Sequence, residues 1–215
     1  HYLVLDDDLD GIYNKFHKMT KRNIKRATKN GLKSRASTHG KDILKFYRLY
    51  RRTRKRLGLP CQPYAFIEMI CKFLFSSKMG VLLIVEYNHR LIAGGIFFRF
   101  NGRFSNEFDA WDKDFDAFRP NYYLYWEAIK VAHSEGYKTF DFGRTSESNK
   151  GLMDFKNRWG TQVVDLPQFI YPKTALSHKT NQEESWKYRW MSSLCRNAPD
   201  TFQDPIGRFC YRHLG

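Results

Sequence analysis

The sequence has no long hydrophobic run. Its longest unbroken stretch of large apolar residues, Val81 to Val85, is far shorter than the roughly 20 residues that a bilayer-crossing helix needs. No charged start followed by an apolar segment resembles a signal peptide. The sequence therefore predicts a soluble, cytoplasmic protein.

Cysteine is scarce, and the common metal and nucleotide motifs are missing. The four cysteines, Cys61, Cys71, Cys195 and Cys210, show no CxxC spacing, and the seven histidines form no HExxH motif. There is no P-loop and no GxSxG nucleophile elbow. We therefore expect buried, reduced thiols rather than disulfides, and no metal site.

Acidic residues are nearly missing from one region. Between Gly11 and Arg56 the chain has seventeen Lys or Arg residues and a single acid, Asp42, so the net charge of +15 is concentrated there. Such a field attracts polyanions or an acidic membrane face. It does not distinguish between these partners.

The residues that are present fit one main α+β domain. A chain of 215 residues with 42% hydrophobic residues can bury a substantial core. We expect a basic lead-in helix in residues 1–30, a main domain in residues 31–173, and a helical tail in residues 174–215 that packs on it. Because the chain starts at His1 rather than Met, we expect a fragment of a longer protein.

Apolar residues at helical spacing predict the first elements. Residues 11–30 are expected to form an amphipathic, cationic helix that ends before Gly31, with Ile12, Phe16, Met19 and Ala27 on one face. A strand over residues 32–38, a helix over residues 42–57 and a third helix starting at Pro63 are expected next.

After residue 80 the spacing becomes that of strands. Extended runs over residues 81–87, 90–100 and 103–111 predict an antiparallel meander, and Asn101-Gly102 is a strong hairpin signal. The remaining expected elements are a helix over 120–134, a strand over 138–142, a helical patch over 150–158, and an extended stretch over 162–171.

Three segments then carry a family resemblance. They are KRNIKRATKNGL at residues 21–32, RPNYYLYWEA at 119–128 followed by FDFGR at 140–144, and DFKNRWG at 154–160. In this order they resemble the FemAB-like (FemXAB) peptidyltransferases and the related BioF2-like acetyltransferases of the GNAT superfamily. The expected element order is also that of a GNAT-like (acyl-CoA N-acyltransferase) fold, with a central, mostly antiparallel sheet flanked by helices.

The resemblance implies an N-acyltransferase. Characterised members move an aminoacyl group from aminoacyl-tRNA to an amine on a lipid-linked or nucleotide-linked peptidoglycan precursor. It further implies that this chain is the C-terminal half of a two-half protein. The expected partners are an anionic precursor or tRNA, with peripheral contact at the inner face of the cell membrane.

Acyl transfer to an amine needs positive charge near the developing oxyanion and an acceptor for the departing proton. The family resemblance implicates Lys156 in the first role, although a lysine on a helix face is also commonly solvated. Asp141, and after it Asp109, are candidate proton acceptors, although turn and cap positions also favour aspartate.

Further residues are predicted to bind substrate. Arg144 follows a glycine and either binds phosphate or pairs with Asp141. The other candidates are Tyr122 and Tyr125 for an acceptor groove, Phe155 beside the catalytic lysine, and Lys25 and Arg26 for an anionic partner. Each of these residues also fits an ordinary role in the core or on the surface.

The glycine-rich turn that cradles CoA in GNAT enzymes is missing. The corresponding place reads FRPNY at residues 118–122, and Pro120 removes a backbone donor there. We therefore expect no bound cofactor and favour aminoacyl-tRNA over acetyl-CoA as the donor, with Arg119 still able to hold a phosphate.

Three other interpretations stay open. One is a nucleic-acid-binding module in which residues 15–29 follow phosphates, with salt-sensitive affinity, although no DNA partner is expected. Another is a CoA-dependent N-acetyltransferase. The third is a non-catalytic half-domain. The acceptor and the oligomeric state are not predicted.

Overall fold

The structure, a computed structural model, describes residues 1–167 and 186–213. The chain divides into two compact units. The larger unit comprises His1–Tyr50 and Tyr64–Val164, and the smaller comprises Arg51–Pro63 and Asp165–Gly215. Among the described residues, no helix is both long and apolar enough to cross a membrane.

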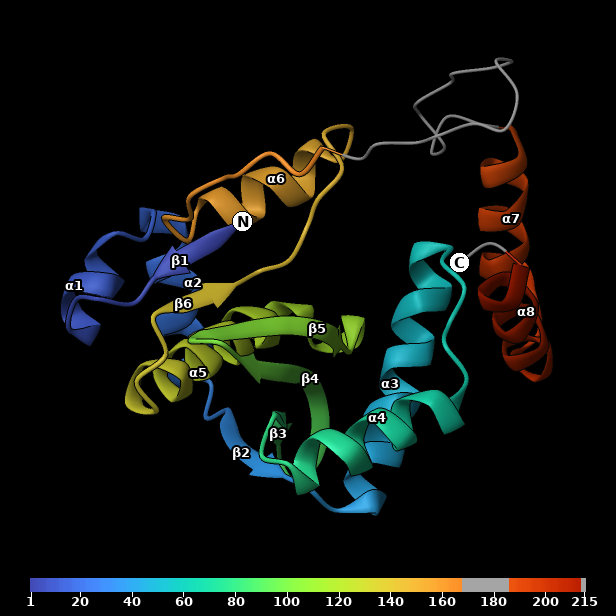
Figure 1. Cartoon of the computed structure of the whole chain (residues 1–215), viewed down its shortest axis with the longest axis horizontal. Coiled ribbons are helices and arrows are strands. Elements are labelled where there is room, and N and C mark those ends of the chain that lie inside the picture. The colour runs from blue at the N-terminus through green and yellow to red at the C-terminus, as the bar shows by residue number, and fades with distance from the viewer. Residues whose placement is uncertain (168–185, 214–215) are drawn as a thin grey trace. The chain divides into compact units, whose positions relative to one another are not determined.

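The larger unit is built on one six-stranded sheet (Figure 1). In spatial order its strands are β1 (Tyr2–Val4), β6 (Thr139–Asp141), β5 (Arg103–Trp111), β4 (Arg90–Phe100), β3 (Gly80–Tyr87) and β2 (Lys33–Ser37). Only β5 and β6 pair in parallel, and the other neighbours are antiparallel. The predicted α+β fold with a mostly antiparallel sheet is confirmed.

The turn between β4 and β5 has the geometry that its sequence predicts. Asn101 and Gly102 both have positive φ, 47° and 71°. A type I′ turn requires this at its two central positions, and its twist matches that of the flanking strands.

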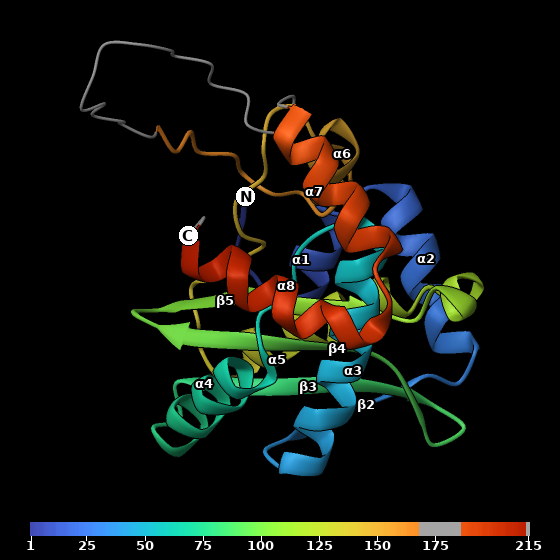
Figure 2. The same ribbon diagram turned by 90° about the vertical axis from the view of Figure 1, so that its right-hand side faces the viewer.

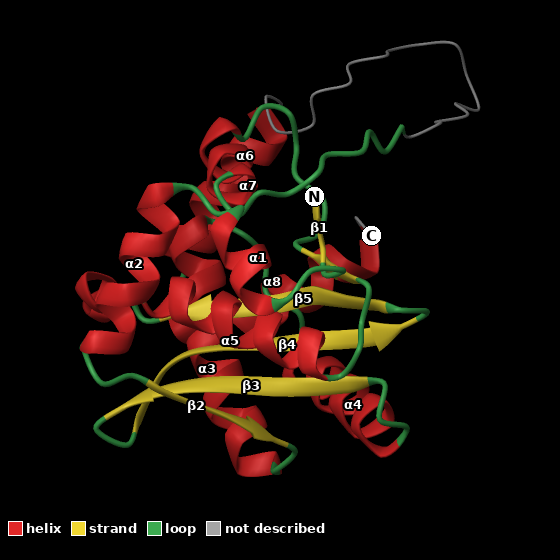
Figure 3. Cartoon of the chain, turned by 90° about the vertical axis from the view of Figure 1, so that its left-hand side faces the viewer, coloured by secondary structure: helices red, strands yellow, loops and turns green. Residues whose placement is uncertain are grey.

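Helices cover both faces of this sheet. On β3, Val81, Leu83 and Val85 belong to the hydrophobic core that includes α5 (Pro120–Ser134), while Leu82 and Ile84 are buried on the opposite face, as strand alternation requires. Figure 3 shows α5 lying across the strands, with α2 (Lys18–Lys29) beside it, and Figure 2 views the face where α4 (Tyr64–Ser76) contacts β3. The other helical segments of this unit are α1 (Leu9–Asn14), a 3-10 segment η1 (Lys113–Phe118) and α6 (Lys150–Asn157).

The expected single helix over residues 11–30 is wrong: the structure has two helices, α1 and α2. The chain breaks at Phe16, whose buried ring contacts Trp126 and Trp159. His17 then caps α2, because its side chain accepts a hydrogen bond from the backbone N–H of Met19. Apolar residues at helical spacing continue across this break, so the apolar pattern does not indicate it.

The expected extended stretch over residues 162–171 is largely wrong where it can be compared. Gln162 forms one isolated bridge with Tyr2, and residues 163–167 form no strand. Residues 168–171 lie outside the described part of the chain.

The smaller unit contains the end of α3 (Gly40–Leu57), which begins in the larger unit, together with α7 (Trp186–Asn197) and α8 (Asp200–His213). The helical tail is therefore present, and its packing on the main domain stays a prediction. All four cysteines are free and buried, as expected, and burial raises the pKa of Cys71 to about 12.

Asp42 joins β2 to α3 through two strong hydrogen bonds. Its Oδ2 atom accepts from Arg35 Nη1 at 2.8 Å and from Ser37 Oγ at 2.6 Å. The Arg35 hydrogen bond, opposed by burial and supported by Ser37, lowers the pKa of Asp42 to about 2. This carboxylate therefore stabilises the fold above pH 4, and the contribution is lost as the pH falls through 2.

We predict that Asp42→Asn lowers the free energy of unfolding at pH 7 by about 2 kcal/mol. The variant and the wild type should converge below pH 2, because the wild-type carboxyl is then protonated. Denaturant titrations at both pH values test this, with the exposed Asp10→Asn as a matched control that should change stability little. A loss that is the same at both pH values would contradict the ion-pair explanation.

Candidate active site

The site begins at a β-bulge in β5. Phe97 pairs with Asn106 and Ile96 pairs with Phe108, so Glu107 has no partner in β4. In a regular strand, residues 106 and 109 would point to opposite faces. The extra residue turns both side chains toward the same face.

Asn106 connects the two elements that meet at this bulge. Its Nδ2 atom donates to Asp109 Oδ1 and to the Tyr125 hydroxyl, both at 3.1 Å. Tyr125 lies on α5 and is 5% exposed. Burial, and secondarily the charge of Asp109, raises the pKa of this phenol well above its usual value, so Tyr125 stays neutral and can orient the carboxylate network.

Asp141 holds the turn that follows β6. Its Oδ1 atom accepts from the Gly143 backbone N–H at 2.7 Å, and its Oδ2 atom accepts from Arg103 Nη1 at 3.1 Å. Gly143 has a φ of 76°, in the region that favours glycine. Residues 103–105 of β5 pair with residues 139–141 of β6, and the pairing ends there. The chain therefore leaves the sheet at the turn after Asp141.

Lys156 lies where these two groups meet. It is only 4% exposed, and its Nζ atom donates to the carbonyls of Gly143 at 2.8 Å and Arg144 at 3.2 Å. Burial lowers its pKa from 10.5 to about 8, while the charges of Asp109 and Asp141 oppose that shift. At neutral pH the site therefore contains a buried ammonium that interacts electrostatically with two carboxylates, and it can stabilise a developing negative charge more strongly than a solvated lysine can.

An aromatic cluster supports this lysine. Trp159 is completely buried, and the Tyr122 ring stacks on it at 5.8 Å. Phe155 contacts Tyr122 at 5.4 Å and Tyr125 at 5.7 Å. The structure thus places the predicted Tyr122, Tyr125 and Phe155 side chains beside Lys156 as packed rings, and their contact with a substrate stays a prediction.

The structure brings Lys156, Asp109 and Asp141 within electrostatic reach of one another. Of the predicted basic residues, Arg144 contacts Lys156 through its backbone carbonyl, whereas Lys25 and Arg26 lie on α2. Lys25 and Arg26 are exposed on α2, and Arg144 is exposed in the loop after Gly143. Asp141 pairs with Arg103, so the expected pairing of Arg144 with Asp141 is not the one observed.

Arg119 stands at the start of α5 in a left-handed conformation, with a φ of 58°. Its Nη1 atom lies 3.5 Å from Asp116. The arginine side chain makes no capping hydrogen bond to the helix. It is therefore placed where the sequence predicted a phosphate ligand, and that role stays a prediction.

Sequence reasoning missed three residues of the site: Arg103, Asn106 and Gly143. Gly143 directly follows a predicted strand, which is a signal for a special backbone position. Asn106 and Arg103 gave no such signal, because their roles depend on the bulge and on the parallel pairing of β5 with β6.

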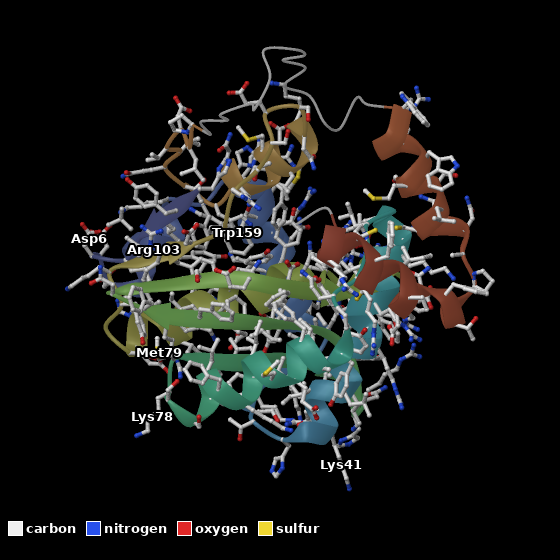
Figure 4. All side chains as sticks on the ribbon, turned by 45° about the vertical axis from the view of Figure 1, so that its right-hand side comes forward. Asp6, Lys41, Lys78, Met79, Arg103 and Trp159 are labelled. Atoms are coloured by element: carbon white, nitrogen blue, oxygen red, sulfur yellow. The ribbon has the colours of Figure 1, made fainter. Side chains whose placement is uncertain are left out.

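A groove of about 550 Å³ opens next to this site. Arg103 lines it together with apolar side chains of α4, β4 and the connecting segment, namely Leu74, Met79, Phe98 and Phe100. Met79, Arg103 and the supporting Trp159 are labelled in Figure 4. Because Arg103 also binds Asp141, the groove adjoins the candidate catalytic residues.

The geometry can now be compared with known proteins. The family described as Acetyltransferase (GNAT) domain matches residues 14–157, which include Asp109, Asp141 and Lys156. The chain belongs to the GNAT acetyltransferase-domain family. The match begins at the last residue of α1 and ends at the last residue of α6, so it covers strands β2 to β6 and the helices between them but not β1.

Individual relatives support a FemAB-like member of this family. Lipid II:glycine glycyltransferase from Staphylococcus haemolyticus (strain JCSC1435) is 31% identical over 97 residues, which cover 41% of this chain and 23% of that protein. The crystal structure of FemX has a TM-score of 0.69 at 17% identity, covering 75% of this chain and 58% of that one. The predicted FemAB resemblance is confirmed.

A second solved structure shows the same fold. A possible acetyltransferase from Clostridium difficile 630 has a TM-score of 0.55 at 9% identity, covering 66% of this chain and 98% of that one. This chain spans less than a quarter of the glycyltransferase and somewhat more than half of FemX.

Proposed function

We propose that this GNAT domain is an N-acyltransferase that moves an acyl or aminoacyl group onto an amine of a cell-wall or envelope precursor. The observation that carries the proposal is the buried Lys156 ammonium, which donates to two backbone carbonyls and interacts electrostatically with Asp109 and Asp141. The name of the glycyltransferase relative, which acts on lipid II, supports the acceptor class.

In this mechanism the acceptor amine attacks the carbonyl carbon of the donor ester. The Lys156 ammonium stabilises the negative charge that develops on the carbonyl oxygen. The amine's proton passes to Asp109 or Asp141, directly or through water. Collapse of the tetrahedral intermediate forms the amide and expels the donor's alcohol, which takes up a proton.

The donor and the acceptor use different surfaces in this proposal. We assign the groove beside Arg103 to the acceptor, because it adjoins Asp141. We assign the cationic α2 surface, with Lys25 and Arg26, to an anionic partner such as tRNA or the precursor's phosphates. Arg119 is a further phosphate ligand at the start of α5, and the reaction takes place at the cytoplasmic face of the membrane.

The donor is tested by comparing two labelled substrates with the full-length protein and an amine-bearing precursor. We expect transfer from aminoacyl-tRNA and no saturable binding of acetyl-CoA. If acetyl-CoA binds saturably at micromolar concentration and its acetyl group is transferred, then acetyl-CoA is the donor and aminoacyl-tRNA is not. No transfer from either donor would contradict the proposed function.

The pKa of Lys156 gives a pH prediction. Because its ammonium loses a proton at about pH 8, the rate of the wild type relative to Lys156→Arg should fall as the pH rises above 8. The arginine variant stays charged throughout, so it corrects for deprotonation of the acceptor amine and for hydrolysis of the donor. A ratio that rises with pH would instead indicate that Lys156 acts as a base.

A further inference from the structure

The two C-terminal helices carry aromatic residues on their outward faces. On α7, Trp186 and Trp190 are 72% and 66% exposed, and Leu194 continues the same i, i+4, i+8 stripe. On α8, Phe202 and Phe209, seven residues apart, are 58% and 64% exposed. We call these five side chains the aromatic face; α7 and α8 are labelled in Figure 2.

The opposite faces of α7 and α8 are buried, so each helix has one packed face and one exposed aromatic face. Cys195 and Ala198 are buried near the end of α7, and Gln203 and Cys210 are buried on α8. Gly207 lies so close to the Cys61 carbonyl that a Cβ atom would collide with it. The smaller unit therefore has an interior of its own, and its large aromatic residues face outward.

Basic residues accompany the aromatic face. The described parts of the smaller unit, residues 51–63, 165–167 and 186–213, contain ten Lys or Arg residues and three acids, Asp165, Asp200 and Asp204. Asp200 is already bound by Lys55 at 2.7 Å. Four arginines on α7 and α8 are exposed: Arg189, Arg196, Arg208 and Arg212.

We infer that the aromatic face is a docking surface for an anionic phospholipid membrane. Tryptophan and phenylalanine insert at the boundary between headgroups and acyl chains, and neighbouring arginines attract anionic headgroups. This combination distinguishes a membrane from a neutral protein partner, which the excess of positive charge does not favour. Membrane binding does not depend on the proposed transfer, although it would keep that site at the surface where a lipid-linked acceptor lies.

The test is co-sedimentation of the full chain with vesicles of phosphatidylcholine, alone or mixed with phosphatidylglycerol. We expect binding to the anionic vesicles that weakens with added salt, and little binding to the neutral ones. The double variant Trp186→Ser, Trp190→Ser should bind at least about tenfold more weakly, because two interfacial anchors are lost. Its thermal unfolding should match the wild type, since both side chains are exposed.

Phe73→Ser is the matched control. Phe73 is 68% exposed on α4 of the larger unit, so its loss removes an exposed aromatic ring outside the aromatic face and should leave vesicle binding unchanged. The inference is overturned if the wild type does not bind anionic vesicles, or if both variants weaken binding equally. It is also overturned if light scattering shows a wild-type dimer that the tryptophan variant dissociates, because the face then joins two copies.

A soluble amine acceptor separates this inference from the proposed function. The tryptophan variant should transfer to a soluble acceptor at the wild-type rate. Vesicle binding without any transfer would leave the membrane surface in place and contradict only the acyltransferase proposal. Transfer without vesicle binding would support the acyltransferase proposal and contradict the membrane-docking inference.

Discussion

Replacing Lys156 with methionine is expected to lower acyl transfer by at least about 100-fold, because the charge that stabilises the oxyanion is lost. Stability should respond differently. Burial lowers the pKa of Lys156 to about 8, so the unfolded chain binds this proton more tightly than the folded one. The buried charge therefore costs about 3 kcal/mol below pH 8, and that cost is relieved as the pH rises from 8 to 10.5.

Methionine removes this cost but also leaves the Gly143 and Arg144 carbonyls without their donor. We therefore expect the free energy of unfolding at pH 7 to stay the same or rise, and the increase in stability between pH 8 and 10.5 to disappear. Transfer assays and denaturant titrations at both pH values measure the two effects. Lys150→Met changes an exposed lysine on the same helix and should leave both unchanged. Full activity in Lys156→Met would remove this lysine from the mechanism.

Truncating Trp159 to alanine should cost about 3–5 kcal/mol of unfolding free energy. Its side chain is fully buried and contacts the rings of Phe16, Tyr122, Phe142 and other members of the cluster. The substitution leaves a large cavity against Phe155, the residue before Lys156 on α6, so transfer should fall as well.

Trp159→Phe separates the ring contacts from the indole N–H. Within the described part of the chain, the Nε1 atom of Trp159 has no hydrogen-bond partner, so phenylalanine loses no bond there. We expect this variant to lose less than half as much stability as the alanine variant. Trp190→Ala is the exposed control and should change stability by less than about 0.5 kcal/mol. Equal losses for the phenylalanine and alanine variants would contradict the packing explanation.

Local chemistry explains why some elements could be predicted to the residue. α5 begins at Pro120, which suits the first helical position, and ends at Ser134, two residues before Gly136, which has a φ of 78°. β1 was missed because its three residues pair with β6, more than 130 positions away in the chain. The expected helix over 11–30 failed for a similar reason, since the break at Phe16 is stabilised by rings of α5 and by Trp159.

The same limit applies to the site. Lys156 was identified from a local motif, and Asp109 and Asp141 from their places at the ends of strands. Their proximity depends on the separation of β5 from β6 after residue 105. This separation is a property of the whole sheet and cannot be read from a short segment of sequence. Pairing with Asp141 was one of two roles predicted for the nearby Arg144, and the observed partner of Asp141 is Arg103 on the neighbouring strand, thirty-eight positions earlier.

The unpaired Glu107 also affects how related sequences should be aligned. Asn106 can bond to both Asp109 and Tyr125 because one residue of β5 is skipped by β4. A relative that lacks this extra residue would present a different side chain at the position of Asp109. An alignment of such a relative without a gap at Glu107 would therefore shift one side of β5 by one position.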